Sequence, residues 1–198
     1  MARILITSWG SHGDVNPYIG LARGLAARGH EPVLATPEYY RSAVEAEGIG
    51  FRPVGPNVDP SDARTVQRIM DARRGSQILL REILYPKIEE SHAELSAALR
   101  GAELIVSHPV TFAAPIIAAQ TGIPWVSTVL APMSFFSRFD LSVFAPAPWM
   151  KRAERLGGWV APALVRIARA VSAKWPEPVY RLRERLALPR GADPMFEG

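Results

Sequence analysis

Residues 3–8 of this chain read RILITS, and residues 9–17, which follow directly, read WGSHGDVNP. The centre of the first segment is apolar and β-branched, and the second segment is polar and contains two glycines. Such a run is typical of a buried strand that ends in a tight turn. Asn16 and Pro17 then resemble a helix cap and a first-turn proline, so we expect a helix to begin there.

The alternation of strand and helix patterns continues along the first 54 residues. A second strand is predicted over residues 32–36 and a third over 51–54, and residues 37–47 between them carry a helical pattern that Gly48 closes. Strands that alternate with helices indicate a parallel sheet with helices on its faces. The predicted fold class is therefore α/β, with an open, Rossmann-like parallel sheet.

A predominantly helical region, residues 63–99, interrupts this alternation. We expect it to break near residues 74–76 and to kink at Pro86, because proline lacks a backbone donor. The strand pattern then resumes within the same domain. The later elements that we expect are strands at 103–107 and 124–128, a helix at 110–120, and further helices up to about residue 188.

Length and composition exclude several classes of protein. The chain has 198 residues, 48% of them hydrophobic and 21% charged, which fits one large globular domain or two small ones. Cysteine is absent, so the chain has no disulfide framework, thiolate metal site or cysteine nucleophile. The formal net charge of +4 does not by itself indicate nucleic-acid binding. No apolar run reaches the roughly 18 residues of a membrane span, and we expect a cytoplasmic protein.

The turn after the first strand is the first candidate site. In open parallel sheets, ligands bind beyond the carboxyl ends of the strands, where the winding direction reverses. Asp14 lies in this turn, and a carboxylate at this place can accept a proton from a bound hydroxyl group. The alternative is that Asp14 only pins the turn by accepting hydrogen bonds from backbone N–H groups. Spacing alone leaves both interpretations open.

A dinucleotide site at the same turn is a weaker hypothesis. The fingerprint G-x-G-x-x-G needs three glycines, whereas Gly10 and Gly13 supply only the spacing G-x-x-G. The phosphate-loop pattern G-x-x-x-x-G-K-[ST] is absent. A nucleotide-dependent oxidoreductase is therefore a disfavoured alternative, and we expect no bound cofactor.

Residues 10–17 (GSHGDVNP) and 21–31 (LARGLAARGHE) together resemble the N-terminus of glycosyltransferases of families 1 and 28. Their opening reads approximately G-[ST]-x-G-D-x-x-P-x-x-x-L-A-x-x-L-x-x-x-G-H, and the glycines, the aspartate, the proline and the closing Gly29-His30 fall in register. The resemblance covers essentially the whole chain. Further matching segments are ATP at 35–37, GI at 48–49, LIVSHP at 104–109, GIP at 122–124 and, more loosely, DPMFEG at 193–198.

The resemblance implies one half of the two-domain GT-B architecture. Residues 1–198 would form the N-terminal acceptor-binding domain, and the C-terminal donor-binding domain would be absent from this chain. The implied reaction is inverting hexosyl transfer from a nucleotide-sugar co-substrate to a hydroxyl group of a hydrophobic or lipid-like acceptor, with no metal. The isolated fragment would be inactive. A non-catalytic binding module that pairs with a separate donor-domain chain is the non-enzymatic alternative.

The resemblance also implies roles for individual residues. Asp14 occupies the position of the catalytic base. His108 follows the fourth predicted strand, which neighbours the first in the usual strand order, so we expect it to bond or polarise Asp14 or to contact the acceptor. The alternative for His108 is an ordinary turn histidine before Pro109. We expect Ser11 and His12 to contact the acceptor, although a solvated loop residue is equally compatible with His12.

Two later segments complete the predicted site. An apolar and aromatic cluster follows the fifth strand, and such linings suit pockets for hydrophobic small molecules, although ordinary packing under a long loop is the alternative. The cluster comprises Met133, Phe135, Phe136, Phe139 and Phe144. The helical region 64–84 is expected to form another wall of the pocket.

Residues 149–185 hold nine Lys or Arg and three Asp or Glu, together with three tryptophans. Basic amphipathic helices of this kind can lie on anionic membranes. The alternative is a packed helix pair with a solvated basic face. Peripheral membrane contact therefore stays open at this point.

Overall fold

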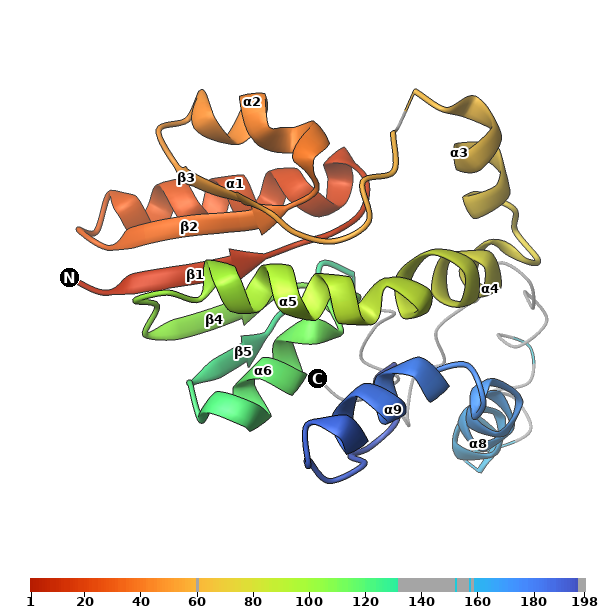
Figure 1. Ribbon diagram of the computed structural model, residues 1–198. Helices are drawn as coiled ribbons and strands as arrows, with labels where there is room; N and C mark the ends of the chain where they lie inside the picture. The colour runs from red at the N-terminus through yellow and green to blue at the C-terminus, as the bar shows by residue number, and fades with distance from the viewer. Residues whose placement is uncertain (60, 132–151, 153–156, 158, 196–198) are drawn as a thin grey trace.

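A computed structural model describes residues 1–59, 61–131, 152, 157 and 159–195 of the chain (Figure 1). Its centre is a five-stranded parallel sheet in the order β3-β2-β1-β4-β5. The strands are β1 (Arg3–Thr7), β2 (Glu31–Thr36), β3 (Gly50–Pro53), β4 (Leu104–Ser107) and β5 (Trp125–Ser127). The predicted α/β class, the parallel sheet and the neighbouring positions of the first and fourth strands are confirmed.

Alternation along each strand divides the core into two layers, because successive side chains point to opposite faces of a sheet. Leu5 on β1 is in register with Val33 and Ile105, and all three are buried in one layer. The next residue, Ile6, is in register with Leu34, and both are buried in the other layer. Both faces of the sheet are therefore covered.

Helices from different parts of the chain cover the two faces (Figure 1). One face packs against α1 (His12–Ala26), the 3-10 turn η1 (Glu38–Tyr40) and α2 (Arg41–Glu45). The other packs against α5 (Ile88–Ala98), α6 (Ala113–Thr121) and α9 (Glu177–Arg185). The helices α3 (Ala63–Ile69) and α8 (Val160–Ser172) lie beyond the carboxyl ends of the strands.

The first helix begins five residues earlier than predicted. The helix begins at His12 with Ser11 as its N-cap, and Pro17 lies inside it. The cause is the spacing of Ser11 and Asp14, because an acidic side chain at the third helical position can return to the backbone N–H of the cap residue. Asp14 makes that bond at 2.8 Å. Asp14 is therefore part of the first turn of α1 and not of the loop before it.

The helical insertion has the predicted interruptions. After α3, the chain breaks and restarts at α4 (Gly75–Ile78), then passes through a π-helical turn η2 (Leu79–Leu84) and a 3-10 turn η3 (Tyr85–Lys87) before α5. Pro86 lies in the 3-10 turn, where its missing N–H prevents a continuous α-helix. None of the helices among the described residues is long and apolar enough to span a bilayer.

Candidate active site

One carboxylate oxygen of Asp14 is fixed by the turn. Its Oδ2 atom accepts hydrogen bonds from the backbone N–H and from the hydroxyl of Ser11, each at 2.8 Å. Gly10 passes so close that a Cβ atom at this position would overlap the carboxylate, and its φ of +141° is one that other residues rarely adopt. The turn therefore holds Asp14 in one orientation and uses one of its two oxygens.

The other oxygen of Asp14 faces His108. The Nε2 atom of His108 lies 3.8 Å from Oδ1, which is longer than a direct hydrogen bond. His108 directly follows β4, and its backbone N–H donates to the carbonyl of Thr7 at 2.9 Å. That bond joins the ends of β1 and β4 and brings the two side chains to the same edge of the sheet. The Asp14 side chain remains 38% exposed, so the carboxylate is not closed off from solvent.

The surroundings of His108 favour a neutral ring with its proton on Nε2. Burial lowers the pKa of His108, and the nearby Asp14 only opposes this effect in part. The Nδ1 atom is buried and has no hydrogen-bond partner among the described residues. Nδ1 is therefore unpaired in either neutral tautomer. The tautomer with its proton on Nε2 directs that N–H toward the Asp14 carboxylate, whose negative charge favours it.

Tyr18 of α1 packs against the His108 ring. Its ring meets the imidazole edge-on, with the ring centroids 5.9 Å apart. The Tyr18 hydroxyl lies 2.7 Å from Oγ1 of Thr128, which itself lies 2.9 Å from the carbonyl oxygen of Ser107. Since Thr128 uses its only hydroxyl proton on that carbonyl, Tyr18 must be the donor to Thr128. This chain of bonds ties α1 to the ends of β4 and β5.

His12 lies beside the site among aromatic residues. It is exposed at the start of α1, and its ring makes edge contacts with Tyr39 and Tyr40. Tyr40 is buried, and its hydroxyl donates to the carbonyl of Gly10 at 2.8 Å. His12 is not among the residues that line the adjoining cavity, whereas Ser11 is.

A cavity of about 340 Å³ opens beside Asp14 and His108. Its polar lining comes mainly from the turn and from His108, and most of the remaining wall is apolar. Six aliphatic or thioether side chains contribute to that wall: Val58, Val66, Ile69, Met70, Leu79 and Val110. Residues of α3 and η2 are among them, which confirms that the helical insertion forms a wall. The other predicted wall residues lie outside the described residues: Met133, Phe135, Phe136, Phe139 and Phe144.

Sequence patterns did not identify Trp9, Tyr18 or Tyr40 as parts of the site. Each is largely buried, and each makes a hydrogen bond that depends on a distant segment. The only signal in the sequence was the position of Trp9, directly before the glycine turn. Among the described residues, no cluster of three or more His, Asp or Glu side chains is arranged to hold a metal ion.

Comparison with known proteins assigns the chain to a family. Residues 4–133 match the model of the glycosyltransferase family 28 N-terminal domain. The chain belongs to glycosyltransferase family 28. The residues that build the turn, Asp14 and His108 all fall inside the matched range.

Curated relatives of this family 28 chain include enzymes from bacteria and fungi. It is 36% identical over 131 residues to O-mycaminosyltylonolide 6-deoxyallosyltransferase of Streptomyces fradiae, an alignment that covers 63% of the chain and 30% of that protein. It is 30% identical over 133 residues to a sterol 3-beta-glucosyltransferase of Neurospora crassa, covering 66% of the chain and 8% of the relative. The chain thus spans less than a third of the length of either relative.

Solved structures of GT-B glycosyltransferases share the fold of this family 28 chain. The calicheamicin glycosyltransferase CalG4 matches with a TM-score of 0.55 and 21% identity, over 94% of this chain and 45% of that one. SsfS6 of Streptomyces sp. SF2575 matches with a TM-score of 0.53 and 19% identity, over 81% of this chain and 46% of that one. At these identities the likeness concerns the fold.

Proposed function

We propose that this chain is the acceptor-binding half of an inverting, nucleotide-sugar-dependent glycosyltransferase, with Asp14 as the general base. The observation that carries the proposal is that the two oxygens of the Asp14 carboxylate have different partners. Oδ2 is held by Ser11, while Oδ1 is directed toward His108 beside the large cavity. A group that only pinned the turn would need no accessible oxygen at a cavity.

The reaction uses Asp14 as a proton acceptor. The acceptor hydroxyl binds with its proton directed at Oδ1, and its oxygen attacks the anomeric carbon from the face opposite the nucleotide. The bond from that carbon to the diphosphate oxygen breaks, and the nucleoside diphosphate leaves with the electron pair. The proton passes to Asp14 as the new glycosidic bond forms. Fixing both substrates in line supplies a further part of the rate.

His108 serves Asp14 as a positioning and polarising residue. Its neutral ring directs an N–H toward Oδ1, 3.8 Å away, and so helps to set the orientation of the carboxylate. When a hydroxyl group binds, His108 can donate to the acceptor oxygen instead. The buried position of the ring against Tyr18 keeps this donor in place.

The acceptor is a hydrophobic or lipid-like hydroxyl compound. The mostly apolar wall of the cavity, in contrast to its few polar groups near Asp14, supports this class. The name of one relative supports the same class, since it is a sterol 3-beta-glucosyltransferase, and another relative is named for the acceptor O-mycaminosyltylonolide. The nucleotide sugar would be held mainly by a C-terminal donor domain or by a separate donor-domain chain.

The substitution Asp14→Asn tests the proposal in the complete enzyme. The amide oxygen can still accept the Ser11 N–H, so the turn is retained while the base is lost. We expect sugar transfer to fall by about 10²- to 10⁴-fold, the usual share of a general base. Circular dichroism and the melting temperature should stay close to those of the wild type. Turnover like that of the wild type would refute the assignment.

Peripheral membrane contact is a separate proposal that rests on α8. Ile167 and Val171 share a face of this helix and are 58% and 68% exposed, with the exposed Arg166 beside them. Flotation with anionic liposomes at low and high salt tests this contact. Binding at low salt would support it, and no binding at either salt concentration would end it.

A further inference from the structure

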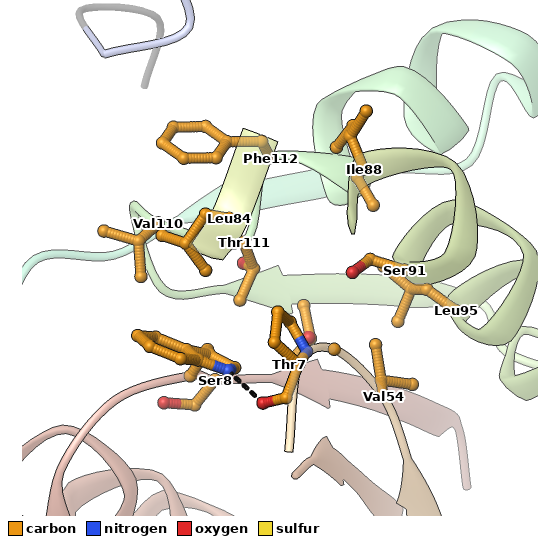
Figure 2. A pocket seen from close by; sticks show the side chains of 14 residues that line it. Thr7, Ser8, Val54, Leu84, Ile88, Ser91, Leu95, Val110, Thr111 and Phe112 are labelled. Atoms are coloured by element: carbon orange, nitrogen blue, oxygen red, sulfur yellow. Dashed lines mark hydrogen bonds between the residues drawn. The ribbon is translucent and has the colours of Figure 1, made fainter. Parts of the chain in front are cut away.

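A second, much smaller cavity lies behind the candidate active site. It has a volume of about 30 Å³, against about 340 Å³ for the outer cavity. Figure 2 shows it between the ends of the strands, represented by Thr7 and Val54, and the side chains of Ile88, Ser91 and Leu95 on α5. The inner cavity therefore extends from the acceptor site toward the core layer on the α5 face of the sheet.

Three residues line both cavities and form the wall between them: Trp9, Pro56 and Val110. Trp9 is the largest of the three and is only 8% exposed. Its indole Nε1 atom donates to the carbonyl of Pro56 at 2.8 Å, the hydrogen bond drawn in Figure 2. Gly55 lies against the ring, where a Cβ atom would come within 3.1 Å of the indole. The indole is thus clamped in one orientation.

The inner cavity also contains an unused polar group. Thr7 is 1% exposed, and its Oγ1 atom has no hydrogen-bond partner among the described residues. A buried hydroxyl without a partner is costly, and Oγ1 of Thr7 has almost no solvent-accessible surface, so the inner cavity is bordered by a polar group that nothing satisfies among the described residues. With the indole in place, the outer cavity ends before this group.

We infer that Trp9 is a specificity-determining residue, which sets how far an acceptor can reach from Asp14 into the protein. The inference rests on the proposed function and adds a length limit for the acceptor. An acceptor hydroxyl at Asp14 leaves its apolar remainder along the outer cavity, and the clamped indole closes the inner end. Removing the indole would join the two cavities and admit a longer acceptor.

The test measures binding of straight-chain 1-alkanols, from butanol to dodecanol, to the full chain by calorimetry. Each methylene that enters an apolar cavity strengthens binding about fourfold. In the wild type we expect the affinity to stop rising once the alkanol reaches a certain number of carbons. In Trp9→Ala the limit should move to a longer alkanol by at least two carbons. Because truncation of a buried indole can unfold a domain, Trp9→Phe is the second variant, with a smaller shift in the same direction.

Val126→Ala is the matched control, because Val126 is 47% exposed on β5 and lines neither cavity. It should leave the length limit unchanged. The inference is overturned if the wild type and the folded Trp9 variants show the same limit of alkanol length. It is also overturned if the affinity of the wild type rises with every added carbon up to dodecanol, or if the wild type binds no alkanol. The proposed transfer reaction is judged separately, because Asp14→Asn removes catalysis while keeping the alkanol limit.

Discussion

The Oδ1 atom of Asp14 and the Nε2 atom of His108 lie 3.8 Å apart, although the two residues follow different strands. The pairing depends on the adjacency of β1 and β4 and on the backbone bond from His108 to Thr7. It gives the chain a carboxylate and a neutral imidazole at the mouth of one cavity. The consequences for pH dependence, turn geometry and stability can each be measured.

The buried His108 should make the stability of the protein depend on pH. Burial lowers the pKa of His108 in the folded state below its ordinary value of 6.5. Between the folded and the unfolded pKa the unfolded chain binds more protons, so stability falls as the pH falls through 6.5 toward the folded pKa. His108→Gln should flatten this part of the curve, as measured by denaturant unfolding between pH 5 and 7.5. His92→Gln is the control, because it removes a histidine of α5 that lies outside the site. If the free energy of unfolding changes with pH equally in His108→Gln and in the wild type, the prediction is contradicted.

Gly10→Ala should damage the site in two ways, by straining the backbone and by overlapping the Asp14 side chain. The φ of +141° strains any other residue, and the new Cβ would displace the Asp14 carboxylate. We expect a loss of about 1–3 kcal/mol in the free energy of unfolding and a large loss of sugar transfer in the complete enzyme.

Gly20→Ala is the matched control for Gly10→Ala. Gly20 is exposed on α1, and a Cβ atom added there would have no other atom within 4 Å. It should stabilise the protein by about 0.5–1 kcal/mol through helix propensity, with transfer unchanged. Equal behaviour of the two variants would show that the turn does not hold Asp14.

Tyr18→Phe should weaken the positioning of the His108 ring. The variant loses the bond to Thr128 but keeps the ring contact with the imidazole. We expect a cost of about 1 kcal/mol in the free energy of unfolding and a moderate fall in the transfer rate at unchanged acceptor affinity. Tyr39→Phe, at a 45% exposed tyrosine, should change neither quantity. If Tyr18→Phe changes neither the free energy of unfolding nor the transfer rate, the Tyr18 hydroxyl does not position the site.

Thr7→Val should stabilise the protein. The hydroxyl is buried without a partner among the described residues, and valine has nearly the same shape. Removing an unsatisfied polar group is expected to gain about 1 kcal/mol in the free energy of unfolding, measured by denaturant titration. Thr111→Val is the comparison, because its hydroxyl donates to the carbonyl of His108 at 2.6 Å and its loss should destabilise. Destabilisation by Thr7→Val as well would indicate an internal water that satisfies the hydroxyl.

The sequence by itself determined the order of strands and helices, the fold class and the place of Asp14 at the first turn. These features follow from hydrophobic periodicity, glycine positions and a motif in register, all of which are local along the chain. The break before Gly75 and the turn at Pro86 are local for the same reason, since they depend on the backbone of those residues.

Only the tertiary structure decided that His108 faces Oδ1 of Asp14 and that Trp9 lies between the two cavities. The start of α1 at His12 is local by contrast, because the Asp14 side chain folds back onto Ser11 three residues before it, whereas the Asn16-Pro17 pattern predicted a later start. Trp9 is clamped by Gly55 and Pro56, which arrive from the end of another strand. Such contacts arise from strand order and register, and these are set by packing between segments far apart in the sequence.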